Sequence, residues 1–155
     1  MKIDHNFIDS IKNNIEELDS LGYELFGVIA ELSSFNMFLE RIKEEVCEND
    51  AEALYSYIQN MINDDYFEYG EEINCPFTKM LYECPKDEIL DFMPNTNPII
   101  EAEDKIIKLI VGETKLDNYT REVLIDFLKE VILAYRHKKL IQECKEKYDE
   151  QNGKS

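Results

Sequence analysis

The sequence predicts an all-α protein, a single irregular bundle of about five to seven helices with a long C-terminal helix. Apolar residues recur at intervals of three and four along most of the chain of 155 residues, as on one face of a helix. Strict alternation of apolar and polar residues never lasts long enough to predict a strand. A chain of this length buries about two thirds of the surface that its unfolded form exposes, so we expect one helical domain over residues 1–150 and a disordered tail at 151–155.

The first three helices are predicted from caps and glycines. Asp4 is a suitable N-cap for the first helix, and Gly22 is its expected stop. A long second helix is expected from about Tyr23 to Glu48, with a buried side that ends at Val46. A third helix follows Asp50, which is again a good N-cap residue.

The segment between Gly70 and Pro98 is the least regular, because four prolines punctuate it. Two short helices fit there, one around "FTKMLY" and one around "KDEILDFM" with Pro85 at its start.

The last two helices have clearer boundaries. One is expected from Pro98 to Val111 and is closed by Gly112. The other opens at Asp117 or Asn118 and carries apolar pairs at intervals of four. The helical turn "RHKK" at 136–139 carries charge on every side and interrupts this stripe. We therefore expect the helix to project from the bundle there or to pack against a different part of the protein. We interpret the turn as a solvated face or as a partner for the protein's own acids.

The charge of the chain is strongly negative and localised. The formal net charge is −17; residues 1–100 hold 22 acids against 6 bases, and residues 101–155 hold 12 against 11. Within residues 44–91 the net charge is −12. Such a field repels nucleic acid and anionic membranes and attracts basic proteins. The chain also lacks an apolar run of about 18 residues and the apolar core of a secretory signal, so we expect a cytoplasmic protein without membrane contact.

Familiar catalytic and cofactor signatures are missing from the sequence. The two histidines, His5 and His137, accompany no nucleophile elbow, and the five glycines form no phosphate-binding loop. The four widely spaced cysteines predict free, mostly buried thiols. We therefore predict no catalytic residues, no cofactor and no metal.

One carboxylate pattern points to an enzyme instead. Glu68 and Glu71 are three residues apart, and so are Glu88 and Asp91. This arrangement resembles the paired carboxylates of all-α nucleotide pyrophosphohydrolases of the MazG type. The resemblance implies a magnesium site formed by these four residues, since four convergent carboxylates suit a hard cation.

The stretch "NDDYFEYGEE", residues 63–72, combines five carboxylates with three aromatic rings. We expect at least one tyrosine to be exposed among the acids, where it would form a hot spot for a basic protein surface. The stretch looks like the binding segment of the small helical immunity proteins that neutralise bacterial nuclease toxins. The predicted partner-binding residues are Asp64, Asp65, Tyr66, Glu68, Tyr69, Glu71 and Glu72.

These observations predict a non-enzymatic acidic inhibitor of a basic, nucleic-acid-handling protein: an immunity protein, an antitoxin or a phage anti-defence protein. It would cover the active site of its partner or mimic the charge of nucleic acid, without binding nucleic acid itself. A magnesium-dependent nucleotide pyrophosphohydrolase and an acidic helical adaptor are the alternatives.

Overall fold

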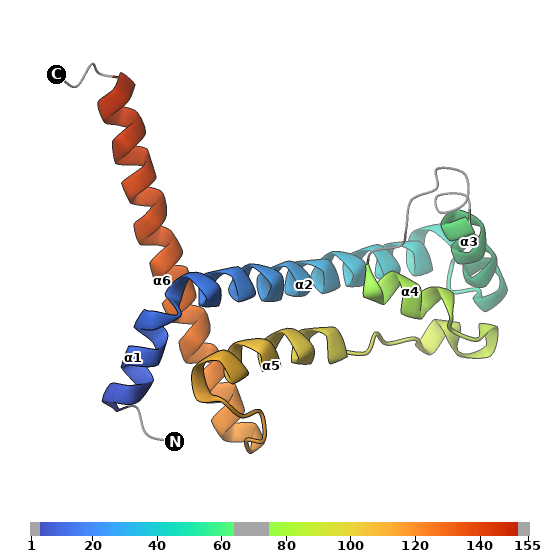
Figure 1. Cartoon of the computed structure of the whole chain (residues 1–155). Helices are drawn as coiled ribbons and strands as arrows, with labels where there is room; N and C mark the ends of the chain where they lie inside the picture. The colour runs from blue at the N-terminus through green and yellow to red at the C-terminus, as the bar shows by residue number, and fades with distance from the viewer. Residues whose placement is uncertain (1–3, 64–74, 152–155) are drawn as a thin grey trace. The chain divides into compact units, whose positions relative to one another are not determined.

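The structure, a computed structural model, describes residues 4–63 and 75–151, and every regular element among them is helical. The all-α class and the long C-terminal helix are therefore confirmed (Figure 1). In chain order the elements are α1 (His5–Asn13), α2 (Ile15–Arg41), the π-helix η1 (Ile42–Val46), α3 (Ala51–Asn63), α4 (Pro76–Tyr82), the 3-10 helix η3 (Lys86–Asp91), α5 (Asn97–Val111) and α6 (Asn118–Gln151).

The chain forms two compact units. Unit 1 consists of Met1–Phe26 and Glu101–Ser155, and unit 2 of Gly27–Ile100, so that α2 and α5 contribute to both. The expectation of one domain over residues 1–150 stays a prediction. Of the predicted tail, Gln151 is the last residue of α6, and residues 152–155 lie outside the described chain.

The prediction that the first helix ends at Gly22 is wrong. The helix breaks at Asn14, whose side-chain amide donates to the carbonyl oxygen of Ser10 at 2.8 Å, and α2 then runs through Gly22 without interruption. A Cβ atom at Gly22 would lie 2.8 Å from the Cδ1 and Cγ2 atoms of Ile132 in α6. The glycine therefore permits a close crossing of α2 and α6 rather than a helix end.

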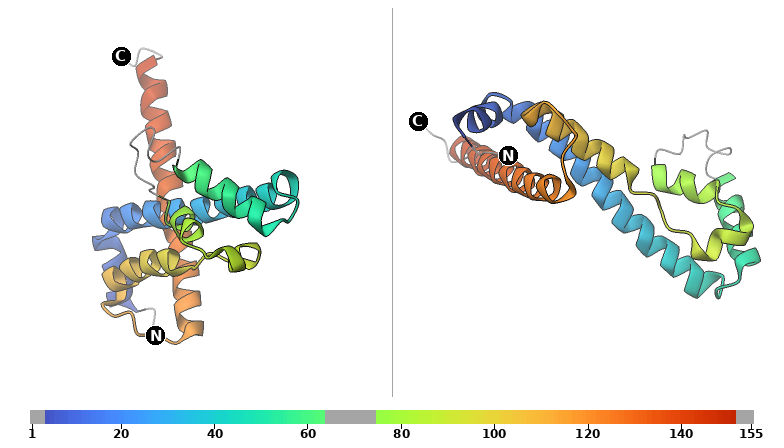
Figure 2. Two further views of the ribbon diagram at one scale, coloured as in Figure 1. Left: turned by 90° about the vertical axis from the view of Figure 1, so that its right-hand side faces the viewer. Right: turned by 90° about the horizontal axis from the view of Figure 1, so that it is seen from below.

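The core of unit 1 lies between α1, the first part of α2, α5 and α6 (Figure 2). The rings of Phe7 and Phe127 join α1 to α6 with centroids 6.0 Å apart. The Ser10 hydroxyl donates to the carbonyl oxygen of Ile110 at 3.1 Å and so joins α1 to the end of α5. The other buried apolar side chains of this unit are Ile11, Leu18, Leu25, Ala102, Ile106, Ile107, Ile110, Leu124, Ile125, Leu128 and Ile132.

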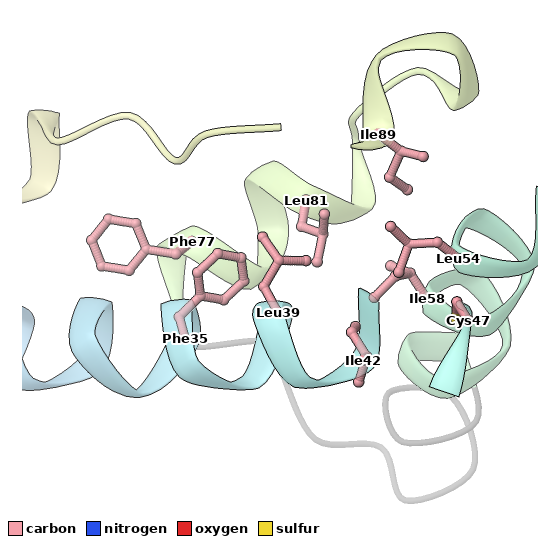
Figure 3. Packing of buried hydrophobic residues seen from close by; sticks show 9 residues of the cluster. All are labelled: Phe35, Leu39, Ile42, Cys47, Leu54, Ile58, Phe77, Leu81 and Ile89. Carbon is pink, nitrogen blue, oxygen red and sulfur yellow. The ribbon is translucent and has the colours of Figure 1, made fainter. Parts of the chain in front are cut away.

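The core of unit 2 is a single cluster shared by α2, η1, α3, α4 and η3 (Figure 3). Phe35 of α2 packs against Phe77 of α4 with ring centroids 6.2 Å apart. Leu54 of α3 and Ile89 of η3 are both fully buried in the same cluster. The remaining members are Leu39, Ile42, Cys47, Ile58 and Leu81.

The local signals at the other helix ends were reliable. The backbone N–H groups of Glu52 and Ala53 donate to the Asp50 carboxylate, as predicted for the start of α3. The N–H of Thr120 donates to Asp117, which settles the choice of cap for α6. Gly112 follows α5 with a φ of 91°, a left-handed conformation that suits glycine. Both short helices of the proline-rich segment are present as α4 and η3.

None of the described helices combines the length and the apolar character that crossing a bilayer requires.

Candidate functional site

All seven predicted partner-binding residues, Asp64, Asp65, Tyr66, Glu68, Tyr69, Glu71 and Glu72, lie outside the described part of the chain. The expectation that at least one of the two tyrosines is exposed therefore stays a prediction. The structure does describe the rest of the acidic segment, 44–63 and 75–91, which belongs to unit 2.

The end of the long second helix has an unexpected register. We predicted Val46 on the buried side, but it is 51% exposed, and Cys47 is buried instead. The cause is the π-helix η1, in which the N–H of Cys47 donates to the carbonyl oxygen of Ile42, five residues before it, at 2.8 Å. This wider turn places Ile42 and Cys47 in the core and rotates Val46 outward.

The chain then reverses over two residues in a left-handed conformation. Glu48 and Asn49 have φ angles of 50° and 60°, and the N–H of Asn49 donates to the carbonyl oxygen of Lys43 at 2.7 Å. This closed turn leads directly into the Asp50 cap of α3. We call residues 44–52 the acidic turn, because it presents five exposed carboxylates around Val46: Glu44, Glu45, Glu48, Asp50 and Glu52.

The 3-10 helix η3 lies next to the acidic turn. The Lys86 ammonium is 3.4 Å from the Glu52 carboxylate, and the Lys43 ammonium donates to the carbonyl oxygen of Leu90 at 2.9 Å. Four more carboxylates are exposed on η3 or shortly before it in the chain. Together with the acidic turn they form what we call the acidic surface, and they are Glu83, Asp87, Glu88 and Asp91.

Three cations near this surface, Arg41, Lys43 and Lys86, contact groups of the protein itself. Lys86 pairs with Glu52, Lys43 is bound to a backbone carbonyl, and Arg41 lies 3.9 Å from Glu45. The described residues 44–63 and 75–91 hold nine acids against Lys79 and Lys86. The surface therefore keeps a net negative field, which it directs toward solvent.

The thiols in this region are poor nucleophiles. Burial, and the negative charge of Asp50, raise the pKa of the Cys47 thiol. Burial and the Glu88 carboxylate raise the pKa of Cys84, while Lys43 opposes this in part. Both thiols are therefore protonated near neutral pH. All four cysteines are free, but only Cys47 is fully buried and Cys144 is exposed, so the prediction of mostly buried thiols is wrong.

The alternative magnesium site is described only in part. Glu88 and Asp91 are exposed on η3, where residues three apart lie on one face of a 3-10 helix. Glu68 and Glu71 lie outside the described residues. Within residues 4–63 and 75–151 no group of three or more histidine, cysteine, aspartate or glutamate side chains is placed to hold a metal ion.

The basic turn 136–139 is partly a partner for the protein's own acids, as one of our two interpretations held. The Arg136 guanidinium donates to the Asp19 carboxylate at 2.6 Å and to the Asp19 carbonyl oxygen at 3.0 Å. It also lies over the rings of Tyr23 and Phe26, 5.4 and 5.8 Å from their centroids. The other three residues of the turn are exposed.

Comparison with known proteins gives no match to a protein family, to a curated protein or to a solved structure.

Proposed function

We propose that this protein is a non-enzymatic inhibitor that binds the basic surface of a nucleic-acid-handling protein in the cytoplasm, as an immunity protein, an antitoxin or a phage anti-defence protein does. The acidic surface is the contact in this proposal. Its carboxylates would pair with arginine and lysine side chains that otherwise hold phosphates. The protein would thereby block the active site or occupy the path of the nucleic acid.

The observation that carries the proposal is the combination of exposed carboxylates with cations that are already engaged. Nine acids of the acidic surface are exposed, and its neighbouring cations Lys43, Lys86 and Arg41 contact groups of the protein itself. Two of the nine carboxylates, Glu45 and Glu52, take part in these pairs, and the other seven would present negative charge to a partner. Complementary charge of this kind accelerates encounter and selects the partner.

Val46 supports a contact that buries apolar area as well. It is 51% exposed in the middle of the acidic turn, and the buried Cys47 beside it fixes the backbone on the core. A preorganised loop loses little conformational entropy when it binds. In the proposal Val46 supplies apolar area among the acids of the interface, and the predicted contacts of Tyr66 and Tyr69 add to it.

The first test uses the basic protein encoded by the neighbouring gene, since an inhibitor and its target are commonly produced together. Calorimetric titration should show a complex whose affinity falls as the salt concentration rises from about 50 mM to about 200 mM. Co-expression should also suppress the nuclease activity or the toxicity of the partner. A complex without inhibition would favour the acidic adaptor.

Charge reversal locates the contact. Glu48→Lys should weaken the complex by about tenfold or more, because it places a cation within the acidic turn. Glu113→Lys makes the same change of charge at an exposed position outside the acidic surface and should have little effect. Equal losses in the two variants would argue against the acidic surface as the contact.

The enzyme alternative makes a different prediction. A magnesium site on Glu88 and Asp91 requires added Mg²⁺ or Mn²⁺ to raise the melting temperature, and Glu88→Gln to abolish that rise. If our proposal is correct, Mg²⁺ or Mn²⁺ should change the melting temperature only slightly, and by the same amount in the unchanged protein and in Glu88→Gln. Asp87→Asn, a neighbouring loss of one charge on η3, is the matched control.

A further inference from the structure

The apolar side chains of α6 occupy two opposite faces of the helix. The first face consists of Leu124, Ile125, Leu128 and Ile132, all buried in unit 1. Ile141 follows Ile132 by nine residues, which is about two and a half turns at about 3.6 residues per turn. Its side chain therefore projects from the side opposite to the one that unit 1 covers.

The second face is exposed. We call Leu140, Ile141, Cys144 and Tyr148 the exposed stripe; Leu140 is 58% exposed, Ile141 45% and Tyr148 66%, and Cys144 is exposed as well. Leu133, seven residues before Leu140, extends the stripe toward the part of α6 that carries Ile132 and is also exposed. Figures 1 and 2 show this part of α6, in red, continuing beyond the point where the helix crosses α2.

The rest of this helical segment is polar, and it is close to electrically neutral. Positions that would continue the buried face carry Lys139, Glu143, Glu146 and Glu150. Residues 133–151 hold five bases and four acids, in contrast to the net charge of −17 of the whole chain. Two acidic surfaces would repel each other, but two copies of this nearly neutral segment would not. The apolar stripe can therefore contact the stripe of a second copy without charge repulsion.

The charges within the segment are also ordered along it. Lys138 and Lys139 stand at its beginning, and Asp149 and Glu150 stand at its end. Two such helices in parallel would bring lysine to lysine and acid to acid. In an antiparallel pair the basic beginning of each helix meets the acidic end of the other.

We propose that the exposed stripe is a self-association surface, on which the C-terminal half of α6 pairs with the same segment of a second copy in antiparallel orientation. The pair has two-fold symmetry, so each residue contact occurs twice. The stripes form the centre of the contact. Lys138 of each copy lies opposite Asp149 of the other, because both residues flank the stripe on the same side of the helix. This inference does not depend on the proposed function.

Sedimentation equilibrium of the full chain tests the association. We expect a reversible dimer of about twice 18.3 kDa with a dissociation constant of about micromolar order, because two short helix faces bury less than a standard interface. A monomer at all concentrations up to about 100 times that constant would overturn the proposal. The stripe would then serve a partner of different sequence.

Substitution within the helix locates the contact. Ile141→Glu should raise the dissociation constant by about tenfold or more, since it places a charge in the apolar centre while keeping a good helix former. Gln142→Glu adds the same charge one residue away, outside the stripe, and should leave the dimer intact. Circular dichroism should show equal helix content in both variants. A dimer that is insensitive to Ile141→Glu, or equally sensitive to both changes, would overturn the assignment.

Charge reversal determines the orientation. In the antiparallel pair Lys138→Glu should weaken the dimer several-fold, Asp149→Lys should do the same, and the two changes together should restore most of the affinity. In a parallel pair both copies would carry the change, so Lys138→Glu would place glutamate opposite glutamate and leave the affinity about the same. That result would overturn the antiparallel arrangement.

Discussion

Gly22 of α2 and Ile132 of α6 lie so close that a Cβ atom on the glycine would be 2.8 Å from two carbon atoms of the isoleucine side chain. Gly22→Ala should therefore destabilise the protein by about 1–3 kcal/mol, although alanine is the better helix former. Urea denaturation measures the change. Gly27→Ala is the matched control on the same helix, because nothing lies within 4 Å of its added Cβ. We expect that variant to be more stable by up to about 1 kcal/mol.

Even a conservative substitution of Arg136 should destabilise the protein, because it disturbs the contact with Asp19. Arg136→Lys keeps the charge but loses the planar group that bonds both the carboxylate and the carbonyl of Asp19, so we expect a loss of about 1–2 kcal/mol. Arg41→Lys should change stability by less than about 0.5 kcal/mol, since the side chains of Arg41 and Glu45 are 74% and 71% exposed. Chemical denaturation of both variants tests the difference. Equal effects would show that the two-point contact of Arg136 with Asp19 contributes nothing to stability.

Asp117 should link the stability of α6 to pH. Hydrogen bonds from the backbone N–H and the hydroxyl of Thr120 hold the pKa of its carboxyl below the ordinary value of 3.8. A lowered folded-state pKa stabilises the protein above the unfolded-state value, and this contribution is lost as pH falls through the folded-state pKa. NMR titration of the carboxyl should show the lowered pKa. Thr120→Val removes the hydroxyl but keeps the backbone N–H, so it should raise the pKa of Asp117 part of the way toward the ordinary value. An unchanged pKa would show that the hydroxyl does not contribute to the shift.

The four thiols should differ in reactivity. Cys144 is exposed in the single chain and should react first with a thiol reagent at neutral pH, at protein concentrations well below the dissociation constant of the proposed dimer. Cys47 and Cys84 should react more slowly, because their raised pKa values leave little thiolate. Mass spectrometry of the modified peptides measures the order, and all four sites should react alike in denaturant. Rapid modification of Cys47 in the folded protein would show that η1 opens readily.

Local sequence signals predicted most of the helix ends correctly, because a cap acts within one turn of its helix. Asp50 and Asp117 accept hydrogen bonds from N–H groups two or three residues later, and Gly112 adopts its left-handed conformation directly after α5. Gly22 misled the prediction since glycine serves both helix ends and close helix crossings. Ile132, which distinguishes the two, lies 110 residues away in the chain.

The acidic character of the candidate site was evident from counting charges, but its geometry was not. Helical periodicity assigned Val46 to the core, whereas the single wider turn of η1 exchanges it for Cys47. Such a turn has no clear signature in the sequence. The predicted tyrosines and acids of 64–72 lie outside the described residues, so their role in binding stays a prediction.

Three features follow from the amino-acid sequence alone, because they depend on neighbouring residues and on composition: the all-α class, the helix caps and the separation of an acidic segment from a nearly neutral C-terminal one. Which residues face solvent, and which long-range contacts form, depends on how the helices pack. The pairing of Arg136 with Asp19 joins positions 117 residues apart, and the second apolar face of α6 becomes visible only when unit 1 has covered the first. Burial is a property of the packed helices, and no local pattern specifies it.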